Sequence, residues 1–451
     1  MASKNNYDYD LVVIGAGSGG VRAARMSAGY GARVAIIEES KMGGTCVNLG
    51  CIPKKLMCYA SHFQDDFIDA QGYGWVANNF VFDWPQFVKK RDQEISRLNQ
   101  IYQNVLEKAN VQIIQGRATL HDPHTVYVNN TKITSQIILI ATGSVPKKLN
   151  FTGYEYTIVS DQIFYLDKIP KHMIIIGTGY IALEFASIFK NWGAQISVIA
   201  RSDQILRTFD IDVQKFLLEE MKKKNINFYF NSNIKMIENH KNIYQVLLDN
   251  KNVLEADVIL YAIGREPNTT HMNLAEIGIH LGKDKEIIVN DYGQSSIENI
   301  YAIGDCTNQS QLTPVAIKQG MAFADTVFGH NKWAVSYDNI PTAVFTNPAV
   351  ASVGLTEKEA AAITKINIFK SQFRPLKHTI SNRDEKVLVK LIVDQHTDKV
   401  LGAHMVGADA PEIIQSLAIS IKMGITKKQF DETMPLHPTV AEEFVTLRQP
   451  V

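Results

Sequence analysis

The sequence is short of cysteine, of long apolar runs and of net charge. Its 451 residues include 46 Lys plus Arg and 46 Asp plus Glu, so it lacks the basic excess that is typical of nucleic-acid-binding proteins. Its apolar runs, such as LVVIGAG, IILIATG and MIIIGTG, are far shorter than the ~20 residues that span a bilayer. The opening stretch MASKNNYDYDLVVIG shows no secretory signal. We therefore expect a cytoplasmic protein without nucleic-acid or membrane partners.

Only four cysteines are present: Cys46, Cys51, Cys58 and Cys306. A secreted disulfide scaffold would have more cysteines in a shorter chain. A structural zinc site would show a second close pair of ligands, and we therefore predict no metal. The C-x4-C pair in GGTCVNLGCIPKK remains either a redox dithiol or two unrelated buried thiols.

What the chain does have is apolar residues, 45% of the total, and two copies of one pattern. An apolar run, a glycine-rich turn, a helical segment and a second apolar run occupy residues 10–39, and the pattern returns at 173–199. Each copy is typical of a βαβ unit. The fold class predicted is α/β, with two Rossmann-like dinucleotide-binding domains.

Three short apolar runs that end in glycine, at 137–143, 258–264 and 299–305, indicate where the chain passes between domains. From about residue 337 the runs VLVKLIVD and KVLGAHMVG and the helical APEIIQSLAISIKMG indicate an α+β C-terminal domain. The predicted domains are 1–145, 146–266, a segment 267–336 that returns to the first domain, and 337–451.

Gly15, Gly17 and Gly20 form G-x-G-x-x-G between a predicted strand and a predicted helix. Glycines here allow a tight turn and let backbone N–H groups approach a pyrophosphate at the helix N-terminus. Glu38 closes the second predicted strand, where a carboxylate can accept hydrogen bonds from a ribose. This loop is predicted to bind FAD.

The second loop has the variant spacing Gly177, Gly179 and Ala182, and its second strand ends without an acid. Arg201 follows that strand and Arg207 comes six residues later. A guanidinium can bind a 2′-phosphate that a carboxylate would repel. The pair predicts NADPH rather than NADH, although two solvated surface arginines would look the same.

A disulfide between Cys46 and Cys51 requires a bend in the chain. An ideal helix separates residues i and i+5 by more than ~8 Å, whereas bridged Cα atoms lie within about 7 Å. Gly50 permits the bend, and Pro53 suits the first turn of a following helix. Lys54 and Lys55 would then lie near a helix N-terminus, a setting that lowers a thiol pKa. This context favours a reducible, flavin-linked pair over a structural disulfide.

Over almost its whole length the chain resembles the class I pyridine nucleotide–disulfide oxidoreductases. The matching segments are GGTCVNLGCIPKK, GTGYIALE, AIGREPN, AIGDCTNQSQLTPVAI and HPTVAEEFV. The dithiol and HPTVAEE segments are specific to that family, whereas the glycine loops alone are not. The chain is most similar to the branch that reduces glutathione disulfide, which implies a homodimer with FAD, NADPH and active sites shared between subunits.

The resemblance also implies individual roles. Cys51 would be the thiol next to the flavin, and Cys46 the thiol that attacks the substrate. His437, held by Glu442 and supplied by the other subunit, would be the acid–base group; unaided, it would be an ordinary loop histidine. Lys54 and Glu184 would pair near the flavin, and Tyr180 would gate the nicotinamide pocket.

Further contacts follow from the same resemblance. The predicted FAD contacts are Gly15, Gly17, Ser18, Gly19, Gly20, Glu38, Thr45, Cys46, Lys54, Ala118, Thr142, Gly143, Asp305, Thr313 and His437. The predicted NADPH contacts are Gly177, Thr178, Gly179, Tyr180, Ile181, Glu184, Arg201, Arg207, Gly264, Arg265 and Ala343. Cys58 and Cys306 receive no role and are expected to be small buried hydrophobes.

Ser18, Arg25 and Tyr102 match the positions that contact glutathione in that branch. Arginine suits a tripeptide with carboxylate ends, and Arg22 and Arg25 would repel the cationic substrate of trypanothione reductases. Met321 stands where many members of the branch have an arginine, so one carboxylate contact is missing and a modified glutathione remains an alternative substrate.

Other family members remain as alternatives. Dihydrolipoamide dehydrogenase shares the dithiol and the His–Glu pair but uses NAD, with an acid in place of Arg201. Mercuric and large thioredoxin reductases need further C-terminal cysteines or selenocysteine, and no cysteine follows Cys306. A non-catalytic flavoprotein would have no reason to retain Cys46 and His437 together.

Overall fold

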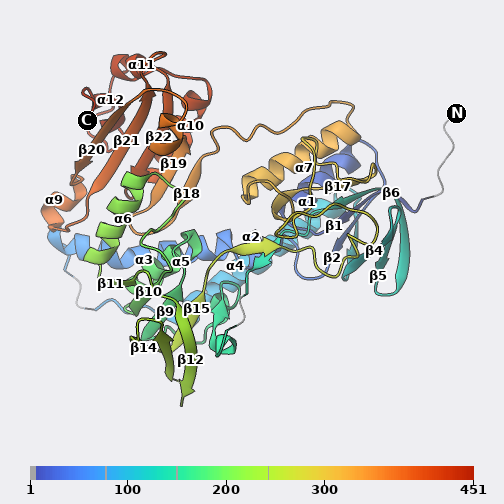
Figure 1. Ribbon diagram of the computed structural model, residues 1–451, viewed down its shortest axis with the longest axis horizontal. Helices are drawn as coiled ribbons and strands as arrows, with labels where there is room; N and C mark the ends of the chain where they lie inside the picture. The colour runs from blue at the N-terminus through green and yellow to red at the C-terminus, as the bar shows by residue number, and fades with distance from the viewer. Residues whose placement is uncertain (1–6, 77–78, 149–150, 242) are drawn as a thin grey trace. The chain divides into compact units, whose positions relative to one another are not determined.

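The computed structural model describes residues 7–76, 79–148, 151–241 and 243–451. The chain forms two compact units, each built from three segments (Figure 1): Met1–Lys54, Pro85–Lys147 and Arg265–Ser336 in the first, and Lys55–Trp84, Lys148–Gly264 and Tyr337–Val451 in the second. Residues 1–6 and 77–78 of the predicted domain 1–145, and 149–150 and 242 of the predicted domain 146–266, lie outside the described residues. The three predicted boundaries between the four segments remain predictions.

The first unit is organised around a mixed sheet with the strand order β3-β2-β1-β6-β5-β4, and β17 pairs with β6. Its strands are β1 (Tyr9–Ile14), β2 (Val34–Glu38), β3 (Gln112–Gln115), β4 (Ala118–Asp122), β5 (Thr125–Val128), β6 (Thr131–Ile140) and β17 (Ile300–Ala302). The pairs among β3, β2, β1, β6 and β17 are parallel. Strand β2 is buried along its whole length, as expected for a parallel strand covered on both faces.

The helices of the first unit carry several of the predicted site residues. They are α1 (Ser18–Gly29), α2 (Gly44–Asn48), the greater part of α4 (Trp84–Glu107) and α7 (Thr313–Val327), with the short turn η3 (Gly304–Cys306). Helices α1 and α7 lie side by side (Figure 1). A separate two-stranded ribbon pairs β7 (Ser144–Pro146) with β16 (Arg265–Pro267).

The second unit contains a parallel sheet with the order β11-β10-β9-β15-β8. Its strands are β8 (Ile158–Val159), β9 (His172–Ile176), β10 (Gln195–Ile199), β11 (Ile226–Tyr229) and β15 (Val258–Tyr261). A separate antiparallel sheet consists of β12 (Ile234–His240), β13 (Ile243–Leu248) and β14 (Val253–Ala256). The helical segments of this part of the unit are α3 (Cys51–Gly72), η1 (Tyr154–Tyr156), η2 (Gln162–Tyr165), α5 (Tyr180–Asn191) and α6 (Ile211–Lys223). The first residues of α3 belong to the first unit.

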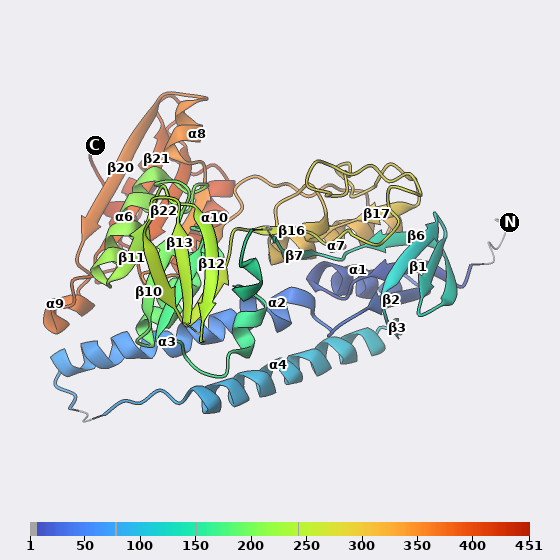
Figure 2. The same ribbon diagram turned by 60° about the horizontal axis from the view of Figure 1, so that its bottom comes forward.

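The same unit includes a C-terminal antiparallel sheet with the order β18-β19-β22-β21-β20. Figure 2 labels β20, β21 and β22 of this sheet. Its strands are β18 (Thr342–Val344), β19 (Val350–Gly354), β20 (Ile366–Phe373), β21 (Val387–Asp394) and β22 (Val400–Val406). The accompanying helices are α8 (Glu357–Ala361), α9 (Lys377–Ser381), α10 (Ala410–Lys422), α11 (Lys427–Glu432) and α12 (Glu443–Thr446). Buried residues of β21, β22 and α10 share one core.

The fold class predicted from the sequence is confirmed. The orders β3-β2-β1-β6 and β11-β10-β9-β15 are each that of a nucleotide-binding half of a Rossmann fold. Helix α1 follows β1 and helix α5 follows β9, and each of these helices begins within its glycine loop, at Ser18 and at Tyr180. Within the described ranges, the chain has no helix that is both long and apolar enough to cross a membrane.

Candidate active site

Cys46 and Cys51 flank a break between two helices. Cys46 lies in α2 and Cys51 is the first residue of α3, and Gly50 stands between the helices. A Cβ at Gly50 would lie 2.8 Å from the carbonyl oxygen of Thr45, which is too close for a side chain. The bend predicted at Gly50 is therefore present. Both cysteines are free thiols, with Cys46 half-buried and Cys51 exposed.

The two thiols differ in acidity. A hydrogen bond from the Cys46 thiol lowers the pKa of Cys51 to about 6, although the surrounding atoms partly shield its sulfur from water and oppose the shift, and Thr313 and Lys54 also lower this pKa. The Sγ atom of Cys51 lies 3.6 Å from the hydroxyl oxygen of Thr313. The same hydrogen bond and burial raise the pKa of Cys46. At neutral pH Cys51 therefore carries the charge, and Cys46 needs a base before it can act as a nucleophile.

Ser18 and Tyr102 lie beside this dithiol. Burial raises the pKa of Tyr102, the neighbouring thiols of Cys46 and Cys51 add to that effect, and a hydrogen bond with Ser18 and the charge of Arg22 oppose it. Ser18, Arg22 and Arg25 are spaced at i, i+4 and i+7 in α1, so they share one face of that helix. The structure thus brings Ser18 and Tyr102 to the thiols and places the exposed Arg25 on the same helix face as Ser18.

The first glycine loop has the shape of a pyrophosphate cradle. A Cβ at Gly20 would lie 2.0 Å from the carbonyl oxygen of Gly15, so α1 starts where only glycine fits. A Cβ at Gly17 would meet nothing within 4 Å, which leaves open space at the helix N-terminus. The carboxylate of Glu38 accepts hydrogen bonds from the backbone N–H groups of Ala16, at 2.7 Å, and Ser40, at 2.8 Å. These features fit an FAD pyrophosphate and ribose.

Other predicted flavin contacts lie in the same unit. The hydroxyl of Thr142 is buried and forms no hydrogen bond of ordinary geometry among the described residues, although it lies close enough to the Cys306 thiol to lower the pKa of that thiol, so a ligand could still engage it. The hydroxyl of Ser144 donates to Asp305 at 2.8 Å, and burial raises the pKa of Asp305. The remaining contacts predicted in the first unit are Gly19, Thr45, Lys54, Ala118, Gly143 and Thr313, whereas His437 belongs to the second unit.

The second glycine loop is tied to the segment that carries the two arginines. The hydroxyl of Thr178 donates to the carbonyl oxygen of Gln204 at 3.1 Å, and the N–H of Leu206 donates to the carbonyl oxygen of Thr178 at 3.0 Å. Arg201 and Arg207 are both exposed. A Cβ at Gly179 would again meet nothing within 4 Å, so the second loop also leaves space for a pyrophosphate.

The other predicted NADPH contacts divide between the units. Gly177, Tyr180, Ile181, Glu184, Gly264 and Ala343 belong to the second unit, and Arg265 to the first. Tyr180 is 48% exposed at the start of α5, whereas Glu184 is buried and accepts a hydrogen bond from the backbone N–H of Phe345 at 2.9 Å. The Nε and Nη2 atoms of Arg265 donate to the hydroxyl and carbonyl oxygens of Ser144 at 2.9 and 2.6 Å.

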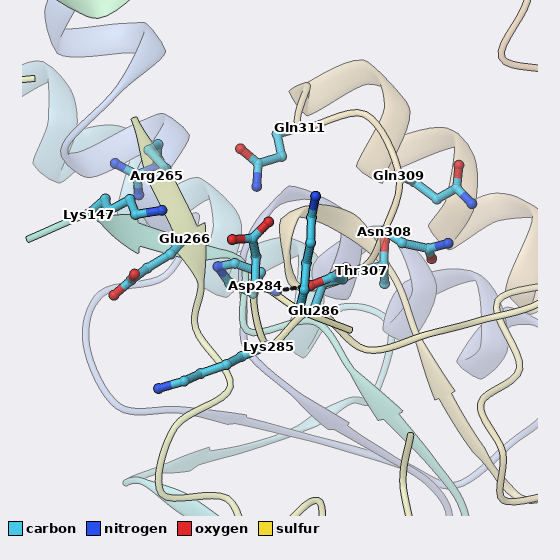
Figure 3. A pocket seen from close by; sticks show the side chains of 12 residues that line it. Lys147, Arg265, Glu266, Asp284, Lys285, Glu286, Thr307, Asn308, Gln309 and Gln311 are labelled. Atoms are coloured by element: carbon cyan, nitrogen blue, oxygen red, sulfur yellow. Dashed lines mark hydrogen bonds between the residues drawn. The ribbon is translucent and has the colours of Figure 1, made fainter. Parts of the chain in front are cut away.

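Arg265 also lines a polar cavity of about 440 Å³ in the first unit. Figure 3 shows the side chains around it, which include Lys147, Asp284 and Gln311. Acidic and basic groups alternate around this cavity, and among the described lining residues Arg265 is the only one predicted from the sequence to belong to a site. The cavity is therefore distinct from the dithiol site.

His437 lies in the second unit, where its Nδ1 atom is 3.1 Å from Oε2 of Glu442. The side chain of His437 is 79% exposed and that of Glu442 is 19% exposed. The predicted pairing of these two residues is thus present. A carboxylate on Nδ1 leaves Nε2 as the nitrogen that can exchange a proton.

Sequence reasoning missed two polar residues near these sites. Ser144 bridges Asp305 and Arg265, and its position directly after the glycine-ended run 137–143 was the signal that could have found it. Ser202 accepts a hydrogen bond from Nη2 of Arg207 at 2.9 Å, for which the sequence offers no signal beyond the neighbouring Arg201. Cys58 and Cys306 are buried, as expected for small hydrophobes.

Comparisons with known proteins agree with this geometry. Residues 9–320 match the family described as pyridine nucleotide-disulphide oxidoreductase, and residues 340–448 match the dimerisation domain of the same description. A glutathione reductase of Nostoc sp. is 47% identical over 457 residues, which cover 98% of this chain and 100% of the relative. A glutathione reductase of Burkholderia cepacia is 46% identical over 443 residues, with 98% and 99% covered. The chloroplastic/mitochondrial glutathione reductase of Pisum sativum is 41% identical over 457 residues, with 98% and 83% covered.

Proposed function

This chain belongs to the pyridine nucleotide-disulphide oxidoreductase family, and on that premise we propose that it reduces glutathione disulfide to glutathione with NADPH, through FAD and the Cys46–Cys51 dithiol. The names of relatives that match nearly the whole chain support this substrate. The observation that carries the proposal is the dithiol itself: two free thiols flank the break between α2 and α3, and the hydrogen bond between them lowers the pKa of Cys51 and raises that of Cys46.

We assign FAD to the loop at Gly15–Gly20 and NADPH to the loop at Gly177–Ala182. The open space at Gly17 and Gly179 supports both assignments, and the buried hydroxyl of Thr142 supports the first. FAD, when bound, supplies the two-electron relay between NADPH and the dithiol. Arg201 and Arg207 would bind the 2′-phosphate of NADPH, and Glu38 would bind the FAD ribose.

The chemistry on the protein's own sulfur atoms is thiol–disulfide exchange. Cys46 loses its proton to the histidine, attacks one sulfur of glutathione disulfide and forms a mixed disulfide, and the leaving glutathione thiolate takes the proton back. The Cys51 thiolate then attacks the sulfur of Cys46, forms the Cys46–Cys51 disulfide and releases the second glutathione as a thiolate, which takes a proton from the solvent. Two electrons and one proton, supplied by NADPH as a hydride equivalent, reopen the disulfide to one thiol and one thiolate. The raised pKa of Cys46 is the reason that a base is required.

We place that base, His437, on the second subunit of a homodimer. The residue lies within the stretch 340–448 that matches a dimerisation domain, and its side chain is 79% exposed on its own chain. Glu442 fixes the tautomer of the imidazole. Shared active sites, a cytoplasmic location and the individual site residues are parts of this proposal.

Substrate assays test the proposal against the alternatives. The FAD-loaded protein would be assayed with glutathione disulfide, its amide form, trypanothione disulfide, lipoamide and cystine, each with NADPH and with NADH. We expect the highest kcat/KM for glutathione disulfide with NADPH. Faster turnover of lipoamide with NADH would instead identify the protein as a dihydrolipoamide dehydrogenase. Faster turnover of the amide form than of glutathione disulfide itself would indicate that the site lacks a carboxylate contact because Met321 replaces an arginine.

A further inference from the structure

A lysine in the middle of strand β21 is completely buried. The side chain of Lys390 has no exposed surface, and its ammonium nitrogen lies 2.8 Å from Oδ1 of Asp210, 2.8 Å from Oδ2 of Asp212 and 2.6 Å from Oε2 of Glu357. A buried ammonium is costly unless it is paired. Burial works to lower the pKa of Lys390, but the three carboxylates raise it, so the amine stays protonated.

One oxygen atom from each of the three carboxylates lies within 4.8 Å of the other two. Among the described residues, this is the group of acids that could hold a metal ion. The ammonium of Lys390 is bonded to each of them. These acids therefore surround a protonated amine, and the cluster is an ion-pair network rather than a cation site. The role of this network therefore depends on which elements the three acids connect.

Asp210 connects three elements. It is the N-cap of α6, where its Oδ1 accepts a hydrogen bond from the N–H of Asp212 at 3.0 Å. Its Oδ2 accepts another from the N–H of Glu357, the first residue of α8, at 2.9 Å. With Lys390, Asp210 thus joins the start of α6, the start of α8 and strand β21 at one buried point.

Asp210 also ends the segment that carries Arg201 and Arg207. Within that segment the N–H of Phe209 donates to the carbonyl oxygen of Leu206 at 2.8 Å. Leu206 is in turn bonded to Thr178 of the glycine loop. The segment is therefore fixed at two points, at Thr178 and at Asp210, and Arg207 lies between them.

We propose that Lys390 is a positioning residue for the recognition of the 2′-phosphate of NADPH. It belongs to the stretch 340–448 that matches a dimerisation domain, yet it anchors the end of the arginine segment through Asp210. Cofactor preference would then depend on a residue outside the nucleotide-binding part of the sequence. This inference rests on the proposed function of the second glycine loop, and it assigns no contact between Lys390 and the nucleotide.

The test uses the FAD-loaded protein and ligand binding by calorimetry, with NADP⁺, NAD⁺ and 2′,5′-ADP as probes. In Lys390→Met the carboxylates lose their common partner, so the arginine segment should lose its anchor at Asp210. We expect the affinities for NADP⁺ and 2′,5′-ADP to fall roughly tenfold or more, as for one lost charge-assisted contact, and the affinity for NAD⁺ to change less than about twofold.

A matched control is Lys370→Met. Lys370 contacts the same Asp212 carboxylate at 3.2 Å, but its side chain is 35% exposed, and it makes no bond to Asp210 among the described residues. This variant should bind all three probes as the unchanged protein does. If Lys390→Met fails to fold, the double variant Lys390→Met/Asp210→Asn removes an unpaired charge, retains a capping residue and should show the same selective loss.

Equal losses for all three probes, or a lower Tm with an unchanged NADP⁺/NAD⁺ affinity ratio, would overturn the inference and leave Lys390 a purely structural role. An unchanged protein that does not prefer NADP⁺ over NAD⁺ would overturn it as well. None of these outcomes depends on disulfide reduction, so a failure to reduce glutathione disulfide would refute the proposed substrate without affecting this result.

Discussion

The Nδ1 atom of His437 lies 3.1 Å from a carboxylate oxygen of Glu442, and the imidazole is 79% exposed on its own chain. A histidine that is oriented by a carboxylate but otherwise solvated is suited to complete a site on another molecule. Residues 340–448 of this chain, which include His437, match the dimerisation domain of its family. The pair therefore provides a direct test of whether active sites are shared.

Subunit complementation is that test. A Cys46→Ser chain and a His437→Ala chain should each be nearly inactive, because general acid–base catalysis contributes ~10²–10⁴-fold. Random mixing makes about half of the dimers mixed, each with one working site of two, so about a quarter of wild-type activity should return. The measurement is glutathione-disulfide turnover by the mixture, and by purified heterodimers, which with one working site of two should reach about half of wild-type activity. Absence of recovery would place His437 in the site of its own chain.

Replacement of either thiol should separate the two halves of the reaction. Cys46→Ser and Cys51→Ser should each abolish disulfide reduction and leave FAD bound. Cys46→Ser should still oxidise NADPH with an artificial electron acceptor, because reduction of the flavin precedes exchange at sulfur. Cys58→Ser is the control, since Cys58 is buried and outside the proposed site, and it should retain turnover. Appreciable glutathione-disulfide turnover by either active-site variant would contradict the dithiol assignment.

Replacement of Arg201 and Arg207 together should raise the KM for NADPH and leave the use of NADH nearly unchanged, since NADH has no 2′-phosphate. One charge-assisted contact contributes about 1.5–3 kcal/mol, or roughly tenfold to over a hundredfold in affinity. Steady-state kinetics with both nucleotides make the comparison. If both KM values rose equally, the arginines would be serving the fold instead.

The acidity of Cys51 predicts a pH dependence. Because its pKa is lowered to about 6, the reduced protein should form a thiolate as the pH rises through about 6 and lose it below that value. Difference ultraviolet absorbance between the reduced protein and its Cys51→Ser variant would follow this thiolate. A titration midpoint near the ordinary thiol value of ~8.5 would show that the hydrogen bond from Cys46 does not stabilise the charge.

The open space at Gly17 predicts a variant that folds without its flavin. A Cβ at Gly17 meets no atom of the described residues within 4 Å, so Gly17→Ala should fold but obstruct the pyrophosphate. Gly29→Ala is the control, because a Cβ at Gly29 also meets nothing within 4 Å but lies at the far end of α1. We expect flavin absorbance to be lost in the first variant and kept in the second. A flavin-loaded Gly17→Ala protein would contradict the assignment of this loop.

Features encoded within a short stretch of chain were predictable. The glycine spacing of both loops, Glu38 at the end of its strand and the bend at Gly50 all depend on neighbours within one βαβ unit or one turn. The pairing of His437 with Glu442 also spans only five residues, but it was expected from the resemblance to the family and not from the spacing itself. For such features, spacing in the sequence and distance in space are nearly equivalent.

Features that depend on distant contacts were not predictable. Lys390 interrupts the apolar run VLVKLIVD and resembles a solvent-facing position, but its burial depends on Asp210, 180 residues away. Arg265 directly follows the run that closes the second nucleotide-binding sheet, yet its guanidinium bonds Ser144 in the first unit. In both cases the partner is chosen by tertiary packing, about which local patterns carry no information.

The separation between Asp210 and Lys390 also bears on how this protein is made. During synthesis from the N-terminus, the carboxylates of Asp210 and Asp212 leave the ribosome long before the amine that neutralises them. Before Lys390 has been made, burial of the two carboxylates would leave their charges unpaired. We therefore expect the start of α6 to stay in contact with water until that point. The second unit can acquire its final core only when β21 has been translated, and we expect nascent chains that end before it to expose this region to proteases.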